Sequence, residues 1–234
     1  MAKRIQGLPA RELIVQTLQE KAMMKQEIFQ QTRNVFNEFK LGLAEVHKDL
    51  MQKVNLKEQK LTFQLQERSD YETSFSFAGD TLIFYMHSNI FCFDRSHFIW
   101  NSTYVKDDES RAYCGVINVY NFLTDSFRYN RENDLGYLIA RIFINRENHY
   151  FVEGKRQLGF LYNDFSTAVT DQQAVTNIIE SAMLYTLDFD LLLPAYDQVK
   201  QVSISELYAA SDALQQRTGK RLGFRFQADT DGVD

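Results

Sequence analysis

Apolar residues recur every three or four positions between residues 10 and 54 of the chain. This spacing places them on one side of an α-helix, because a helical turn takes 3.6 residues. The stretch has no proline and one glycine, Gly42, and it is rich in good helix formers such as Gln, Glu, Lys, Leu and Ala. Pro9 precedes it, where a proline starts a helix without losing a hydrogen bond. The pattern predicts one long amphipathic helix whose stripe contains Val15, Leu18, Ala22, Lys25, Phe29, Thr32, Phe36, Phe39, Leu43, Val46 and Leu50.

The stripe has nearly the heptad spacing of a coiled coil, with polar residues at Lys25 and Thr32. A helix of this length runs about 65 Å, whereas a compact domain made by the rest of the chain is only about 40 Å across. The helix therefore folds back or bends over its own sheet, or it packs part of the stripe on another chain. Lys25 and Thr32 accordingly mark either a register device or a bend. If the stripe binds another chain, the expected contact residues are Leu18, Phe29, Phe36, Phe39, Leu43, Val46 and Leu50.

From Lys60 onward the period changes to 2, the alternation of a strand with one buried face. Ala78-Gly79-Asp80 separates two such runs as a turn. The tetrad Asn-Arg-Glu-Asn occurs twice, at residues 130–133 and 145–148, and predicts turns at both ends of one long strand. The succession predicts an antiparallel meander of about seven or eight strands. Other strands are expected at residues 81–87, 90–93, 98–105, 113–122 and 158–162.

Helical spacing returns near the C-terminus, where two capping boxes each precede a predicted helix. Thr170 with Gln173 begins the first helix, and Ser203 with Glu206 begins the second, at residues 207–216. The predicted fold is α+β, with a long N-terminal helix, a central antiparallel sheet and two C-terminal helices. The expected organisation is an extension (1–9), a long helix or helical hairpin (10–56), a β-rich α+β domain (57–227) and an acidic disordered tail (228–234).

Composition narrows the class of protein. Hydrophobic residues make up 44% of the chain and aromatic residues 14%, enough for a folded core. The net charge of −5 lacks the basic excess of a nucleic-acid-binding domain. Cys92 and Cys114 are too few for a disulfide framework and predict two buried thiols in a reducing compartment. Without a signal-peptide pattern or an apolar run of about 18 residues, the sequence predicts a cytoplasmic protein with no membrane contact.

One group of residues suggests a metal-dependent active site. Asp134 precedes a predicted strand, and Glu153 and Lys155 lie on the next strand. The spacing resembles that of nucleases of the PD-(D/E)xK type, in which two carboxylates hold Mg²⁺ and the lysine orients water. The resemblance covers four residues, lacks the proline before Asp134 and defines no family.

Basic and aromatic residues also gather between residues 128 and 156. Such a mixture binds phosphates or stacks on bases. Acidic residues are interspersed among them, so we expect cross-strand ion pairs and do not favour nucleic acid as a partner. A weak ligand- or phosphate-binding surface would use Arg128, Arg131, Arg146 and Arg156.

The leading hypothesis is a non-catalytic interaction module, without cofactor or bound metal, that forms a homo-oligomer or assembles with a protein partner through its N-terminal helix. The first alternative is a Mg²⁺-dependent nuclease or other phosphate-processing enzyme using Asp134, Glu153 and Lys155. The second is a small-ligand sensor with an aromatic pocket between the sheet and the helices. The sequence identifies neither a partner nor a ligand.

Overall fold

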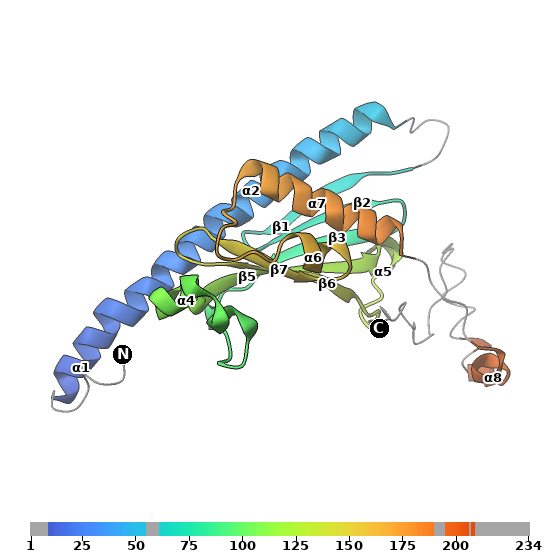
Figure 1. The fold of residues 1–234 in the computed structure, drawn as a ribbon. Coiled ribbons are helices and arrows are strands. Elements are labelled where there is room, and N and C mark those ends of the chain that lie inside the picture. Colours follow the sequence, from blue (N-terminus) through green and yellow to red (C-terminus); the bar gives the residue numbers. More distant parts are fainter. Residues whose placement is uncertain (1–8, 55–60, 190–194, 206, 209–234) are drawn as a thin grey trace.

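The computed structural model describes residues 9–54, 61–189, 195–205 and 207–208, and it shows the predicted α+β architecture (Figure 1). The N-terminal helix consists of α1 (Ala10–Thr17), a π-helical segment η1 (Leu18–Ala22) and α2 (Met23–Lys53). These three segments follow one another without a break. Of the alternatives left open by the sequence, the chain adopts a single helix and no hairpin between residues 10 and 53.

The described part of the chain contains a seven-stranded sheet in which every pairing is antiparallel, as predicted. The strand order is β1-β2-β3-β5-β6-β7, and the short β4 pairs with the beginning of β5. Neighbours in the sheet are thus successive long strands of the chain, which is the definition of a meander. The strands are β1 (Gln64–Ser69), β2 (Glu72–Phe77), β3 (Asp80–Met86), β4 (Phe91–Cys92), β5 (Tyr113–Leu123), β6 (Tyr137–Ile144) and β7 (Tyr150–Gly154).

The predicted turns lie where the backbone is left-handed. Ala78 and Gly79, with φ of 52° and 115°, connect β2 to β3. Asn130 and Asn148, with φ of 50° and 64°, belong to the two tetrads on either side of β6. Asparagine tolerates this conformation because its short side chain bonds locally to the backbone. The tetrads therefore form turns at both ends of one strand, as the repeat predicts.

The prediction was wrong for residues 98–105 and 158–162, which form short helices where strands were expected. Ser102 Oγ accepts a hydrogen bond from the Val105 N–H and begins one of these helices. The apolar residues that resemble a strand pattern, Ile99 and Val105, are buried in a second core. The short helices are η2 (Phe98–Asn101), α4 (Thr103–Asp107), η3 (Glu109–Ala112) and α6 (Gln157–Leu161).

Two helices cover one face of the sheet, α2 and α7 (Gln172–Leu187), and the main core lies between them and the strands (Figure 1). The N-cap of α7 is Asp171, one residue after the predicted Thr170, and its carboxylate accepts a hydrogen bond from the Ala174 N–H at 2.7 Å. The large side chains in this core include Phe36, Phe39, Phe75, Leu82, Phe84, Ile178 and Ile179.

The opposite face carries a smaller core. Residues 93–112, which we call the arm, pack there against Phe143 of β6 and Phe151 of β7. Alternate residues of a strand face opposite sides of a sheet, so β6 and β7 contribute to both cores. Two more short helices are α5 (Thr124–Arg128) and α8 (Tyr196–Val199), and residues 204–205 and 207–208 are helical as well.

Some predictions fall on residues that the structure does not describe. The helix predicted at 207–216 lies outside them except for its first two residues, and the tail 228–234 and most of the extension 1–9 lie outside them as well. Among the described residues, no helix combines the length and the apolar character needed to cross a membrane.

Candidate protein-interaction surface

Most of the predicted contact residues of the long helix are packed inside the chain's own fold. Phe36, Phe39 and Leu43 are fully buried in the main core. Phe29, Val46 and Leu50 are partly buried against the same core. The β-rich body therefore covers the stripe from Phe29 to Leu50, and it leaves little of that part available to another chain.

Thr32 shows where the helix crosses the sheet. It is fully buried, and its Oγ1 donates a hydrogen bond to the carbonyl oxygen of Ile28 at 2.7 Å. It lies against Gly115 of β5 so closely that a Cβ at Gly115 would be 2.0 Å from Thr32 Oγ1. Thr32 is thus neither a bend nor a register device between chains, since it lies at a close contact between α2 and β5 of the same chain.

The N-terminal part of the helix is different, because no residue of α1 or η1 is buried. In Figure 1 this part extends beyond the edge of the sheet. Its large apolar side chains are about half exposed: Ile14 58%, Val15 51%, Leu18 57% and Met23 57%. Leu18 is the one predicted contact residue that stands free of the core. We call the apolar set Ile14, Val15, Leu18 and Met23 the exposed stripe.

The π-helical segment η1 determines which way the exposed stripe faces. The N–H of Met23 donates to the carbonyl oxygen of Leu18, five residues earlier. Such bonding accommodates one extra residue, so the helix is rotated by roughly 100° relative to an uninterrupted α-helix. In a regular helix Val15 and Leu18 would share a seam with Phe29. With η1 present, Leu18 instead approaches the face of Met23, while Lys21 points at the body with its Nζ 5.8 Å from the Tyr113 ring centroid.

The residues of the predicted metal site do not come together. Asp134 accepts hydrogen bonds from Ser126 Oγ at 2.6 Å and from Arg131 Nε at 2.8 Å. Glu153 lies on β7 opposite Arg141 and pairs with it. The part of β6 between Tyr137 and Arg141 alone spans about 13 Å, and Asp134 lies beyond its start.

Lys155, the third residue of that predicted site, follows the end of β7, where its N–H donates to the Ile139 carbonyl oxygen at 3.0 Å. Within the described ranges, no group of three or more His, Cys, Asp and Glu side chains is placed to hold a metal ion. Two acids and a lysine at these positions therefore do not form the compact carboxylate site that Mg²⁺ requires.

The four arginines of the predicted phosphate-binding surface are dispersed, and each pairs with an acidic residue. Arg128 lies 3.6 Å from Asp125, Arg131 lies 2.8 Å from Asp134, and Arg146 lies 2.7 Å from Asp108. Arg156 pairs with Asp188 at the end of α7. Their charge is neutralised locally, as the interspersed acids indicated.

The structure also bears on the two predicted buried thiols and on the predicted sensor pocket. Cys114 is fully buried and burial raises the pKa of its thiol, but Cys92 is exposed, so the prediction of two buried thiols was half wrong. The space between the sheet and its covering helices, where a sensor's pocket was expected, is occupied by core side chains such as Phe39, Phe75 and Phe84.

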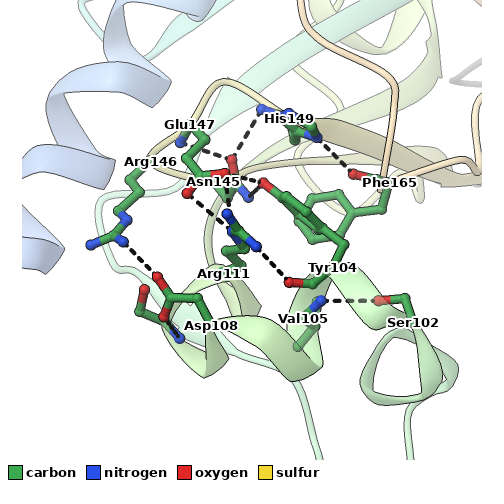
Figure 2. A network of polar contacts seen from close by, with 11 residues as sticks. Ser102, Tyr104, Val105, Asp108, Arg111, Asn145, Arg146, Glu147, His149 and Phe165 are labelled. Carbon is green, nitrogen blue, oxygen red and sulfur yellow. Dashed lines mark hydrogen bonds and ion pairs between the residues drawn. The ribbon is translucent and has the colours of Figure 1, made fainter.

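A polar network that the sequence did not reveal joins the arm to the β6–β7 turn (Figure 2). Tyr104 Oη donates to Glu147 at 2.8 Å and accepts from Asn145 Nδ2 at 2.9 Å. The Tyr104 ring stacks on His149 with centroids 4.6 Å apart. The guanidinium of Arg111 also lies over the Tyr104 ring, with its Cζ 4.3 Å from the ring centroid. The Nε of Arg111 donates to both carboxylate oxygens of Glu147.

Burial and these contacts shift the pKa values of two residues of the network, Tyr104 and Glu147. Burial is the main reason that the pKa of Tyr104 rises to about 12. Burial also raises the pKa of Glu147, but hydrogen bonds from Tyr104 and Arg111 outweigh it, and the pKa ends below its usual value. The tyrosine is neutral and the glutamate ionised at neutral pH, which suits a stable donor–acceptor pair. Because Tyr104 and Arg111 of the arm bond to Asn145 and Glu147 of the turn, we interpret the network as the attachment of the arm.

Only the second Asn-Arg-Glu-Asn tetrad hinted at this network. Asn145 Oδ1 accepts from the backbone N–H groups of Glu147 and His149, both at 3.0 Å, which orients the turn toward the arm. The partners from the arm are more than thirty residues away in sequence, so no local pattern could identify them. Comparison of the chain with protein-family models, with curated proteins and with solved structures found no match.

Proposed function

We propose that this chain is a non-catalytic assembly module that binds another polypeptide through the exposed stripe of its N-terminal helix. The observation that carries the proposal is the helix segment before Ile28, which has no buried residue and presents four half-exposed apolar side chains. Helices in proteins gain most of their stability from packing of their apolar face, and the free segment packs its apolar face on no part of the described chain. A second surface for the stripe would supply that packing.

The β-rich body has a supporting role in this proposal. It clamps α2 against the sheet and α7, and so holds the free segment in a fixed direction. A pre-ordered helix loses less conformational entropy on binding than a flexible segment does. The cytoplasmic location expected from the sequence stays a prediction.

The test is site-specific photo-crosslinking of the full chain in cells that produce it naturally. A photoreactive phenylalanine derivative replaces Leu18 in one variant and Leu41 in another, since Leu41 is also an exposed leucine of the same helix, 68% accessible, but lies outside the stripe. We expect one discrete adduct, with this chain or with another protein, from position 18 and none from position 41. Equal adducts from both positions, or none from either, would refute the proposal.

A further inference from the structure

We propose that the occupant of the exposed stripe is a second copy of this chain, with the two N-terminal helices packed antiparallel. The inference rests on the assembly function proposed above and adds the identity and the orientation of the partner. Three features support it: the length of the free helix, the continuity of the stripe through η1 and the charges at its two ends.

The length of the free helix suits a symmetric pair. Residues 10–27 precede Ile28, the first buried residue of α2, and span about 27 Å. With a two-fold axis beside residue 19, residue 10 of one copy lies opposite residue 28 of the other. The two helices then overlap along the whole free segment, and the overlap ends where the helix of each copy enters its own β-rich body. A parallel pair would instead bring both bodies to the same end, where each α2 is already flanked by its own sheet and α7.

The stripe is continuous across this overlap. Ile14 of α1 and Leu18, the first residue of η1, are four residues apart and share a face. The bond from Met23 to Leu18 in η1 brings the face of Leu18 toward that of Met23. In the antiparallel pair, Val15 of one copy lies opposite Met23 of the other, and the two copies of Leu18 lie beside the axis. An isologous contact of this kind needs one self-complementary surface, which the stripe provides.

The ends of the stripe carry opposite charges. Arg11 lies one helical turn before Ile14 and Val15, and Glu27 lies one turn after Met23; both are exposed. They are sixteen residues apart, about 24 Å, so they cannot pair within one chain. The antiparallel arrangement places Arg11 of each copy opposite Glu27 of the other and forms two ion pairs. A parallel arrangement would place like charges together, which disfavours it.

The apolar area of the exposed stripe indicates how stable the dimer should be. Full burial of a leucine or valine removes roughly 60–120 Å² of apolar area, so four half-exposed side chains contribute on the order of 200 Å² per copy. This is well below the roughly 800 Å² per partner of a stable interface. We therefore expect a reversible, concentration-dependent dimer.

Sedimentation equilibrium on the full chain, from low to high micromolar concentration, tests the inference. Leu18→Glu should weaken the dimer at least tenfold, whereas the control Leu41→Glu should leave its Kd unchanged. Arg11→Glu and Glu27→Arg should each raise Kd by about tenfold, because each reversal replaces two attractive pairs by two repulsive ones. The double variant should return to within about threefold of the wild type, since it restores both pairs between copies. Circular dichroism confirms that the variants fold.

The results separate this inference from the proposed function. If the wild-type chain stays monomeric at all concentrations, the exposed stripe does not bind a second copy of this chain. A discrete adduct between position 18 and another protein would still support the assembly function. If the wild type dimerises and Leu18→Glu leaves the Kd unchanged, the exposed stripe is not the dimer interface. A dimer that needs Leu18, but in which charge reversals have no effect or the double variant is weaker than both single variants, overturns the antiparallel orientation.

Discussion

The contact between Thr32 and Gly115 determines where the long helix lies on the sheet, and Gly115→Ala tests it. The added Cβ would be 2.0 Å from Thr32 Oγ1 and 2.8 Å from both Thr32 Cβ and Thr32 Cγ2. Carbon atoms prefer separations of about 3.5–4.0 Å. A change of rotamer moves Oγ1 and Cγ2, but Thr32 Cβ is fixed to the helix backbone. The helix must therefore shift by roughly 0.7 Å or more to restore an ordinary contact.

That shift is costly because the neighbouring helix residues are fully buried. Ile28 and Phe36, one turn on either side of Thr32, would be pulled from their places in the core. Overpacking a core costs about 1–3 kcal/mol and sometimes more. The stiffer unfolded chain of the alanine variant returns about 0.5–1 kcal/mol. Because backbone and not a side-chain tip must move, the cost lies at the upper end of this range, and we expect a net loss of about 2 kcal/mol in the free energy of unfolding.

Urea unfolding followed by far-ultraviolet circular dichroism measures this loss, and Gly42→Ala is the matched control. A Cβ at Gly42 would meet only side-chain ends, Ile179 Cδ1 at 3.0 Å and Val175 Cγ1 at 3.2 Å. The alanine also gains about 1 kcal/mol of helix propensity, so stability should change by less than about 1 kcal/mol. A Gly115→Ala variant within about 1 kcal/mol of the wild type, or one more stable than Gly42→Ala, would refute the close approach of helix and strand.

Two further predictions concern the ion pairs. Asp134→Ala should destabilise the chain by about 3 kcal/mol in urea unfolding, because it leaves the guanidinium of Arg131, whose side chain is only 9% exposed, without its carboxylate. Asp125→Ala, in the neighbouring and more exposed pair with Arg128, should cost less than about 1 kcal/mol; equal losses would show that Arg131 is solvated. Glu147→Gln should be less stable than the wild type at pH 7, and the difference should shrink toward pH 3. The pKa of Glu147 is lower in the folded chain, so its ionised form stabilises the fold above the usual value of about 4.3 and this contribution is lost as pH falls through the folded pKa. A difference that is the same at both pH values would contradict a role for the ionised carboxylate.

The elements that the sequence determined are those set by neighbouring residues. The change of period at Lys60 predicted a helix followed by strands, because a repeat of 3.6 residues or of 2 residues can be recognised within a few positions of the sequence. The Asn-Arg-Glu-Asn tetrads predicted the ends of β6, because Asn130 and Asn148 tolerate a left-handed backbone. The antiparallel meander followed, because short turns leave few other ways to connect the strands.

The tertiary structure decided which part of the apolar stripe is buried. Periodicity treated Leu18 and Phe36 alike, but the helix crosses β5 at Gly115, so Phe36 lies in the core and Leu18 lies outside the body. The segment η1 then turned the N-terminal residues away from the predicted seam. The acids and arginines that might have formed a site are separated or paired instead. Burial and charge pairing depend on contacts between residues far apart in the chain, and a local pattern contains no information about which of those contacts form.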